Sequence, residues 1–454
     1  MGRPRILLTL GMTPEDARRL AHIGSPERFR FVPLGDDAAA ADPETCRPRT
    51  LLAQAIPALR RLDPPLDGVV AFDDYPASLL SLAIANALGL PGPSLQAALV
   101  CHHKLWSRLA QREAVPRAVP RFQAIDPHAS YRRKDLALDF PFWLKPVKSS
   151  LSHLAFRVRS MAEFEHVRAL ARAQLPRYAA AFNELLELSG LRGPEGFTQV
   201  RGDWLIAEEP LGGRQCTLEG YVHDGRMHVM GIVDSVRLPN RVSFTRFQHP
   251  STLPAAAQRA MIGIARAVMR RIGFDGGMFN IEFFLDPRRG RPMIIEINPR
   301  FCPQFSDLYA KVDGTYGHEV LVELAAGLEP GFARRRGRYA VAASFVLRTA
   351  QDRLVLRAPS AADVARVGAA FPEAYVDLIA AAGDRLSDLA QDSYTYRYAL
   401  INLGAASRGK LMARFRQAEA MLPYSLAPVD AAARQAGAAA PAADAEAADG
   451  LGPE

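Results

Sequence analysis

The chain has 454 residues, a formal net charge of +8, 49% hydrophobic residues and 23% charged residues. This is ordinary globular composition, and the length predicts about three domains. No run of about 18 apolar residues occurs, so no segment is expected to span a membrane. The apolar part of residues 1–12 is short and lacks a small-residue cleavage site, which predicts a first strand and not a signal peptide.

The cysteines and the basic residues argue against several kinds of site. The four cysteines lack the spacing of a zinc site or a disulfide framework, which favours a cytoplasmic protein. They are Cys46, Cys101, Cys216 and Cys302. Only six of the 56 basic residues are lysines, and the basic runs 132–134 and 334–336 are short. Nucleic-acid binding is therefore the weaker alternative, and attraction of anionic substrates such as nucleotides is the stronger one.

The first hundred residues alternate between expected strands and expected helices. The pattern predicts strands at 5–10, 29–33 and 68–72, and helices at 14–23, 50–62 and 75–88. Because βα alternation with short buried strands is typical of a parallel sheet, an α/β unit is expected here. A glycine-rich dinucleotide fingerprint is absent, so NAD binding has no support.

The remaining chain is expected to mix helices and strands. The predicted elements are an amphipathic helix that begins at Lys104, a strand at 140–145, a long helical stretch at 161–190, mainly strands over 204–284 with a helix at 254–272, and an α+β unit at 338–428. The tail 429–454 contains mostly Ala, Asp, Glu, Pro and Gly. It is too poor in large apolar residues to fold alone.

Two apolar runs at 279–285 and 293–298 flank a turn-forming stretch and predict a β-hairpin. If the hairpin closes symmetrically about Arg289, Glu282 and Glu296 face each other across the ladder. An ordinary solvated face is the alternative. It is weaker here because the two acids interrupt strands that are otherwise apolar.

Strand alternation adds further polar groups to these acids. Asn280 lies on the face of Glu282, and Asn298 and Arg300 lie on the face of Glu296. Like charges that face each other repel, so the two carboxylates need a cation. Carboxylate and amide oxygens are the ligands that magnesium prefers, often beside substrate phosphates.

Lysine is scarce, so Lys145 at the end of a hydrophobic strand is informative. The loop that follows is rich in serine and contains Lys148, Ser149 and Ser150. The backbone amides of such a loop can close over phosphates while an ammonium supplies a point charge. The alternative is an ordinary surface lysine beside a polar turn.

A strand that begins near residue 204 runs into the two-glycine turn at 212–213 and out into a second strand. This segment can offer an adenine the carbonyl of Glu209 and the amide of Leu211. Pro210 between them has no N–H to donate, and none is needed there. An ordinary hairpin with an acidic edge is an equal alternative.

Taken in order, these motifs resemble the ATP-grasp superfamily of carboxylate–amine ligases over roughly residues 1–330. The matching positions are Lys104, Lys145-Pro146 with its serine-rich loop, 208–213, 279–282 and 295–300. The Glu…Glu-x-Asn-x-Arg set is the specific part. The chain is most similar to the L-amino-acid ligase and carnosine-synthase-like branch, partly because it has a further C-terminal unit.

The resemblance implies a fold that combines α/β and α+β parts. Residues 1–100 would form an N-terminal pre-ATP-grasp parallel α/β domain. Residues 101–337 would form the two-lobed ATP-grasp fold, with lobes at about 101–205 and 206–337. A small C-terminal α+β subdomain would occupy 338–428, and the tail 429–454 would be disordered.

The resemblance also assigns roles to residues. The phosphate ligands would be Lys104 and Lys145, with Lys148 and 149–152, including Ser149 and Ser150, as the lid. The adenine would be lined by Glu208, Glu209, Pro210 and Leu211, and Gln215 stands where many members have a ribose-binding Glu. Two Mg²⁺ ions, or Mn²⁺ in their place, would be held by Glu282, Glu296 and Asn298.

The implied reaction begins with attack of an acceptor carboxylate on the γ-phosphate of ATP, with Lys145 and Arg300 as catalytic residues. Arg300 would hold the acceptor carboxylate or the acyl phosphate, which an amine then attacks. The implied partners are ATP and small carboxylate and amine substrates, without nucleic acid or membrane, and a homodimer is compatible. For Arg300 the alternative is an ion pair with a neighbouring acid such as Asp307; the acceptor site would then lie elsewhere, at Arg214, Arg237 or Arg241.

Two other function classes stay open from the sequence. A biotin-carboxylase-like enzyme would use bicarbonate as the acid, although the chain has no biotinyl-carrier Met-Lys-Met motif of its own. A non-catalytic nucleotide-binding module is the second, and the intact acidic set argues against it.

Overall fold

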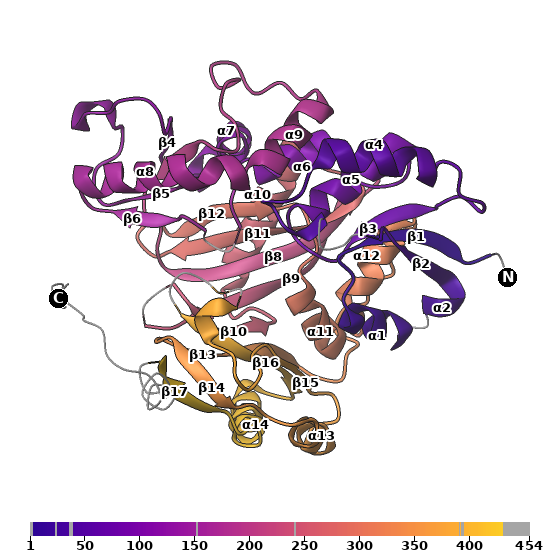
Figure 1. The fold of residues 1–454 in the computed structure, drawn as a ribbon. Coiled ribbons are helices and arrows are strands. Elements are labelled where there is room, and N and C mark those ends of the chain that lie inside the picture. Colours follow the sequence, from indigo (N-terminus) through magenta and orange to yellow (C-terminus); the bar gives the residue numbers. More distant parts are fainter. Residues whose placement is uncertain are drawn as a thin grey trace, which may run out of the picture. The chain divides into compact units, whose positions relative to one another are not determined.

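The structure is a computed structural model that describes residues 3–22, 25–35, 40–150, 153–239, 242–389, 391 and 395–429. The chain divides into two compact units (Figure 1), Met1–Phe345 with Asn402–Phe415 and Val346–Ile401 with Arg416–Glu454. Within the described ranges, no helix is long and apolar enough to cross a membrane. Residues 430–454 of the predicted tail lie outside these ranges.

The first unit begins with the predicted parallel sheet. Its strands, in spatial order, are β2 (Phe29–Pro33), β1 (Arg5–Leu10) and β3 (Gly68–Ala71). Leu7 of β1 faces one hydrophobic cluster while Ile6 and Leu8 face another, as expected for a parallel sheet that is covered on both faces. The covering helices are α4 (Pro48–Leu59) and α5 (Ala77–Leu88) on one face, and α1 (Pro14–His22) and α12 (Gly317–Ala325) on the other.

A four-stranded antiparallel sheet follows in the chain. Its strands, in spatial order, are β4 (Phe122–Ile125), β7 (Leu205–Glu208), β5 (Phe142–Pro146) and β6 (Phe156–Val158). The helix α8 (Met161–Tyr178) packs on it through Phe164 and Leu175. Short connecting elements are α2 (Ser25–Arg28), α6 (Leu95–His102), α7 (Lys104–Ala114), η1 (Pro116–Ala118) and η2 (Arg133–Asp135).

The single helical stretch predicted at 161–190 is two helices, α8 (Met161–Tyr178) and α9 (Ala180–Ser189). Pro176 lies in the last turn of α8 and has no N–H to donate, which weakens the helix where it ends. The chain then changes direction at Ala179, and α9 packs into the core beside α6.

The largest sheet of the first unit is antiparallel. Its strands, in spatial order, are β12 (Arg291–Asn298), β11 (Gly277–Asp286), β8 (Arg214–His223), β9 (Arg226–Arg237) and β10 (Phe244–His249). Phe279, Ile281 and Phe283 face the helix α10 (Ala255–Ile272), and α11 (Pro303–Val312) covers the opposite face. Because side chains alternate along a strand, Asn280 and Glu282 are excluded from the core under α10.

The second unit is a smaller α+β assembly. The points at which the chain passes from one unit to the other lie inside three elements. These are β13 (Val341–Thr349), β16 (Tyr396–Ala405) and α14 (Arg408–Ala420). Its other elements are β14 (Arg353–Arg357), α13 (Ala361–Ala370), β15 (Tyr375–Leu378), η3 (Leu386–Asp388) and β17 (Ser425–Pro428). The antiparallel pair β14–β17 and the buried side chains of Val355, Ala380 and Leu386 form its core.

Candidate active site

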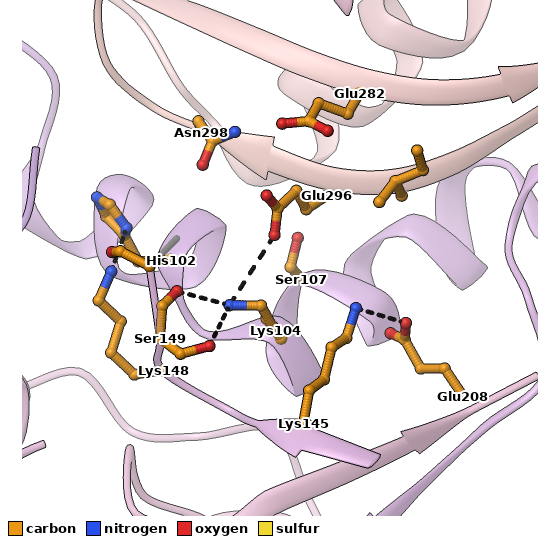
Figure 2. A network of polar contacts seen from close by, with 12 residues as sticks. His102, Lys104, Ser107, Lys145, Lys148, Ser149, Glu208, Glu282, Glu296 and Asn298 are labelled. Carbon is orange, nitrogen blue, oxygen red and sulfur yellow. Dashed lines mark hydrogen bonds and ion pairs between the residues drawn. The ribbon is translucent and has the colours of Figure 1, made fainter. Parts of the chain in front are cut away.

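The hairpin of β11 and β12 carries the two acids in the predicted register. Glu282 pairs with Glu296, and Asn280 pairs with Asn298. The amide of Asn298 donates a hydrogen bond to the Asn280 side-chain oxygen at 3.0 Å. Figure 2 shows Glu282, Glu296 and Asn298 gathered at the same place on these strands.

The hairpin does not close symmetrically about Arg289, so that part of the prediction was wrong. The last pair is Asp286 with Arg291, and a β-bulge follows the Glu282 pair. The bulge places Ile295 as the extra residue and so restores the register at the two acids. The Ile295 carbonyl accepts a hydrogen bond from Arg108 of α7, which holds the bulge against that helix.

The facing carboxylates form an electrostatically unfavourable pair. Burial and the neighbouring Glu296 raise the pKa of Glu282 to about 7. Among the described residues, no group of three His, Cys, Asp or Glu side chains is arranged to hold a metal ion. The two acids would therefore need the Asn298 amide and substrate oxygens to complete the coordination of a metal ion. Two carboxylates and an amide oxygen are hard donors of the kind that Mg²⁺ binds, and a cation would relieve their repulsion.

Two lysines lie beside this pair (Figure 2). Lys104 Nζ is 3.9 Å from a Glu296 oxygen and donates to the carbonyl and hydroxyl oxygens of Ser149 at 2.9 and 3.3 Å. Lys145 Nζ is 2.7 Å from a Glu208 oxygen. Burial lowers the pKa of the Lys104 ammonium below its ordinary value, against the attraction of Glu296. The structure thus places Lys104 beside Glu296, and it places Lys145 beside Glu208.

Glu208 has a buried side chain that is bound on both sides by cations. It accepts hydrogen bonds from Arg108 Nε at 2.7 Å and from Lys145. Burial opposes its ionisation, but Arg108 and Lys145 outweigh that cost and hold its pKa at about 2. The side chain of this residue, predicted to line the adenine, therefore anchors Lys145 in the structure.

Arg108→Leu is expected to lower the free energy of unfolding by about 3–5 kcal/mol, because it leaves the buried Glu208 carboxylate short of a partner. Denaturant unfolding measures this loss. The folded-state pKa of Glu208 is depressed from 4.5, so the stabilisation is present above about pH 4.5 and is lost as the pH falls toward 2. The loss caused by Arg108→Leu should shrink over that interval.

Arg121→Leu is the matched control for this prediction. Arg121 is 64% exposed and lies 3.5 Å from Glu209, so its loss should cost less than about 1 kcal/mol. Equal effects of the two substitutions would contradict the assignment of Arg108 as the buried counter-ion.

The other predicted adenine-lining residues lie at the end of β7. The Glu209 carboxylate accepts the Arg121 N–H at 2.8 Å and pairs with Arg289 at 2.9 Å. Pro210 is exposed and Leu211 is half-buried. The Glu209 carboxylate therefore holds this end of β7 in place through Arg121 and Arg289.

The two-glycine turn passes close to β11. Gly213 has φ +102°, and a Cβ there would lie 2.1 Å from the Leu285 carbonyl oxygen, so the turn requires glycine. The turn leads into β8, where Gln215 Nε2 donates to a Glu282 oxygen at 2.7 Å. Gln215, predicted at the ribose position, therefore contacts the acidic pair.

Arg300 is paired with Asp74, which follows β3 in the N-terminal part of the first unit. Its Nη2 is 2.9 Å from an Asp74 oxygen, and its Nε has no partner among the described residues. Asp307, named above as an example of an alternative partner, binds Lys311 at 2.6 Å, so the ion pair of Arg300 forms with Asp74 and not with Asp307. Burial opposes ionisation of Asp74, yet the Arg300 guanidinium holds its pKa well below the ordinary range.

The other arginines considered for the acceptor have different surroundings. Arg214 lies 3.2 Å from an Asp234 oxygen. The Arg237 guanidinium lies over the Phe284 ring at 4.6 Å from its centroid. Arg241 is outside the described residues.

The residues predicted to form the lid, Lys148 and the serines after it, have different surroundings in the structure. Lys148 is 2% exposed, and its Nζ lies 3.0 Å from His102 Nδ1. The Ser150 N–H donates to the Tyr178 hydroxyl at 3.1 Å. Residues 151–152 are outside the described residues. The predicted lid lysine is therefore buried against α6.

Sequence reasoning missed Asp74, His102 and Arg108. The available signals were an acid in the loop after a buried strand and an arginine one helical turn beyond Lys104. The adjacent His102 and His103 have different partners. His103 caps α7 by accepting the Trp106 N–H, whereas His102 contacts the lysine of the loop.

Comparison with known proteins gives a short sequence match and full-length structural matches. No protein-family model matches the chain. The large chain of carbamoyl phosphate synthase from Thermus thermophilus is 37% identical over 76 residues, which are 17% of this chain and 7% of that protein. This chain therefore matches only a small part of that relative's length.

Solved structures of other proteins match almost the whole chain. The L-amino acid ligase from Bacillus licheniformis has a TM-score of 0.67 at 16% identity, over 94% of this chain and 99% of that chain. A biotin carboxylase from Campylobacter jejuni, solved as a complex with β,γ-ATP, has a TM-score of 0.60 at 14% identity, over 93% and 92%. At these identities the likeness establishes a shared fold.

Proposed function

Because this chain has the ATP-grasp fold of those structures, we propose that it is an ATP-dependent ligase. It joins a carboxylic acid, an amino acid or a small peptide, to an amine and releases ADP and phosphate. The observation that carries the proposal is the facing pair of Glu282 and Glu296 with Lys104 Nζ 3.9 Å from Glu296. Such a set is suited to a magnesium-bound triphosphate, because carboxylates bind the metal and ammonium groups bind the phosphates.

The nucleotide would lie along the two lysines. Lys145, anchored by Glu208, and Lys104, anchored by Ser149, can each direct a remaining N–H to a phosphate oxygen. The loop at Ser149 and Ser150 would close over the phosphates, and Glu209 to Leu211 would hold the adenine through the backbone. The Gln215 contact with Glu282 supports a role in orienting that carboxylate.

Glu282, Glu296 and Asn298 would hold two Mg²⁺ ions. When bound, the metal would supply neutralisation of the phosphate charge. The acceptor carboxylate attacks the γ-phosphorus in line, and ADP leaves. Arg300, whose Nε is unpaired within the described residues, can donate to the acceptor carboxylate and to the acyl phosphate that forms.

The test is a screen of amino-acid pairs with ATP and Mg²⁺, in which ADP and phosphate are quantified and the product mass is determined. We expect ADP release that requires an acid and an amide product that requires an amine. Turnover that depends on bicarbonate and not on another acid would favour a carboxylase, to which the biotin carboxylase likeness points. ATP binding without turnover would indicate a non-catalytic module.

A further inference from the structure

We propose that Lys148, positioned by His102, accepts the proton that the amine nucleophile must lose; this inference rests on the ligase function proposed above. Lys148 Nζ lies 3.0 Å from His102 Nδ1 and 4.1 Å from the centre of the Tyr75 ring. Its polar hydrogen-bonding partner within the described ranges is thus an imidazole and not a carboxylate. An ammonium that is 2% exposed is poorly stabilised by such surroundings.

The charges around Lys148 favour its neutral form. Burial lowers its pKa to about 7, with Lys104 and Arg300 acting in the same direction against Asp74 and Glu296. The groups that face it are His102 of α6, Asp74 and Tyr75 after β3, Lys104 of α7, Glu296 of β12 and Arg300. A lysine amine with this pKa can act as a base near neutral pH.

His102 is suited to hold that amine in place. Burial and Lys148 lower the pKa of His102 well below its ordinary value, so the imidazole is neutral. Its Nδ1 can therefore accept an N–H of Lys148 while the Lys148 lone pair remains available. His102 Nε2 is buried and has no hydrogen-bond partner among the described residues. No second hydrogen bond of the ring therefore competes with the contact to Lys148.

The position of the pair fits the second half of the reaction. In Figure 2 the Lys148–His102 pair lies on the Asn298 side of the cluster, across from Lys145 and Glu208. A triphosphate that extends from Lys145 toward the acids would have its reacting end nearer to Lys148. The acyl phosphate therefore forms on the side where this amine lies.

The proton balance of the step is complete. The amine arrives as an ammonium and transfers one proton to the neutral Nζ of Lys148. Its nitrogen then forms a bond to the acyl carbon, and the bond from that carbon to the phosphate oxygen breaks with its electron pair on phosphate. The second proton leaves the nitrogen with the phosphate, so amide, hydrogen phosphate and protonated Lys148 result.

The decisive variant is Lys148→Arg, which keeps a cation but cannot act as a base at neutral pH. Acid, ATP and Mg²⁺ are supplied with either an amino acid or hydroxylamine as the nucleophile. Hydroxylamine is largely unprotonated at neutral pH and needs no base to attack the acyl phosphate. We expect amide formation to fall about 100-fold or more, while most hydroxamate formation remains.

The parental protein gives a test that does not depend on the variant's folding. Amide formation should decline relative to hydroxamate formation as the pH falls below about 7, because Lys148 becomes protonated. His102→Gln should shift the pH at which amide formation declines relative to hydroxamate formation. Loss of packing alone does not produce such a shift. Lys134→Arg, at an exposed lysine of η2, is the matched control and should behave as the parent.

The outcomes separate this inference from the proposed function. If the parent forms no hydroxamate with any acid, the ligase function itself fails. If the parent forms hydroxamate but Lys148→Arg lowers both products equally, Lys148 has a structural or phosphate-binding role and the inference is overturned. Parental amide formation by Lys148→Arg would overturn it as well.

Discussion

Glu296→Gln is expected to abolish ATP turnover and to leave the fold intact. The substitution removes one of two carboxylates that face each other across β11 and β12. Without metal it should maintain or raise the free energy of unfolding, because the repulsion that raises the pKa of Glu282 is lost. With Mg²⁺ and ATP, the rise in melting temperature that ligand binding gives the parent should disappear.

The experiment combines ADP release with melting curves at several Mg²⁺ concentrations. Glu113→Gln is the matched control, since Glu113 lies at the end of α7 with a side chain that is 55% exposed and pairs with Arg271. Its turnover and its magnesium response should equal those of the parent. An unchanged magnesium dependence in Glu296→Gln would refute the metal site.

Arg300→Lys is expected to retain ATP binding but to lose about 100-fold of the acid-dependent ADP release, as removal of one preorganised donor typically does. A lysine keeps the charge opposite Asp74, which lies 2.9 Å from the guanidinium. It lacks the planar fork that binds a carboxylate through two hydrogen bonds. Titration of ATP binding and of the acid dependence separates the two effects.

Arg271→Lys serves as the control, because Arg271 is 53% exposed and pairs with Glu113 away from the acidic pair. A variant Arg300→Lys that ligates at the parental rate would make Arg300 a structural partner of Asp74. The acceptor site would then have to include another cation, and Arg237 is the candidate because it interacts electrostatically with Glu282.

The sequence alone determined the fold class and the main elements. Short apolar runs placed β1 and β2 at their observed bounds, and the alternation of strands with helices predicted their parallel pairing. The resemblance predicted the ATP-grasp fold, and the structural likeness confirms it. Strand alternation also placed Glu282 and Glu296 opposite each other, but the turn assumed for that pairing does not form, and the bulge at Ile295 restores their register.

Only the tertiary structure decided how the charges of the site are neutralised. Asp74 and Arg300 form an ion pair although they are 226 residues apart in the sequence. Lys148 contacts His102, which is 46 residues earlier in the sequence. The bulge at Ile295 depends on Arg108 of a distant helix. Local periodicity assigns a side chain to a face, but the partner of a buried charge depends on which elements pack together. A buried charge without a partner is costly, so these long-range contacts fix the protonation and position of the groups in the site.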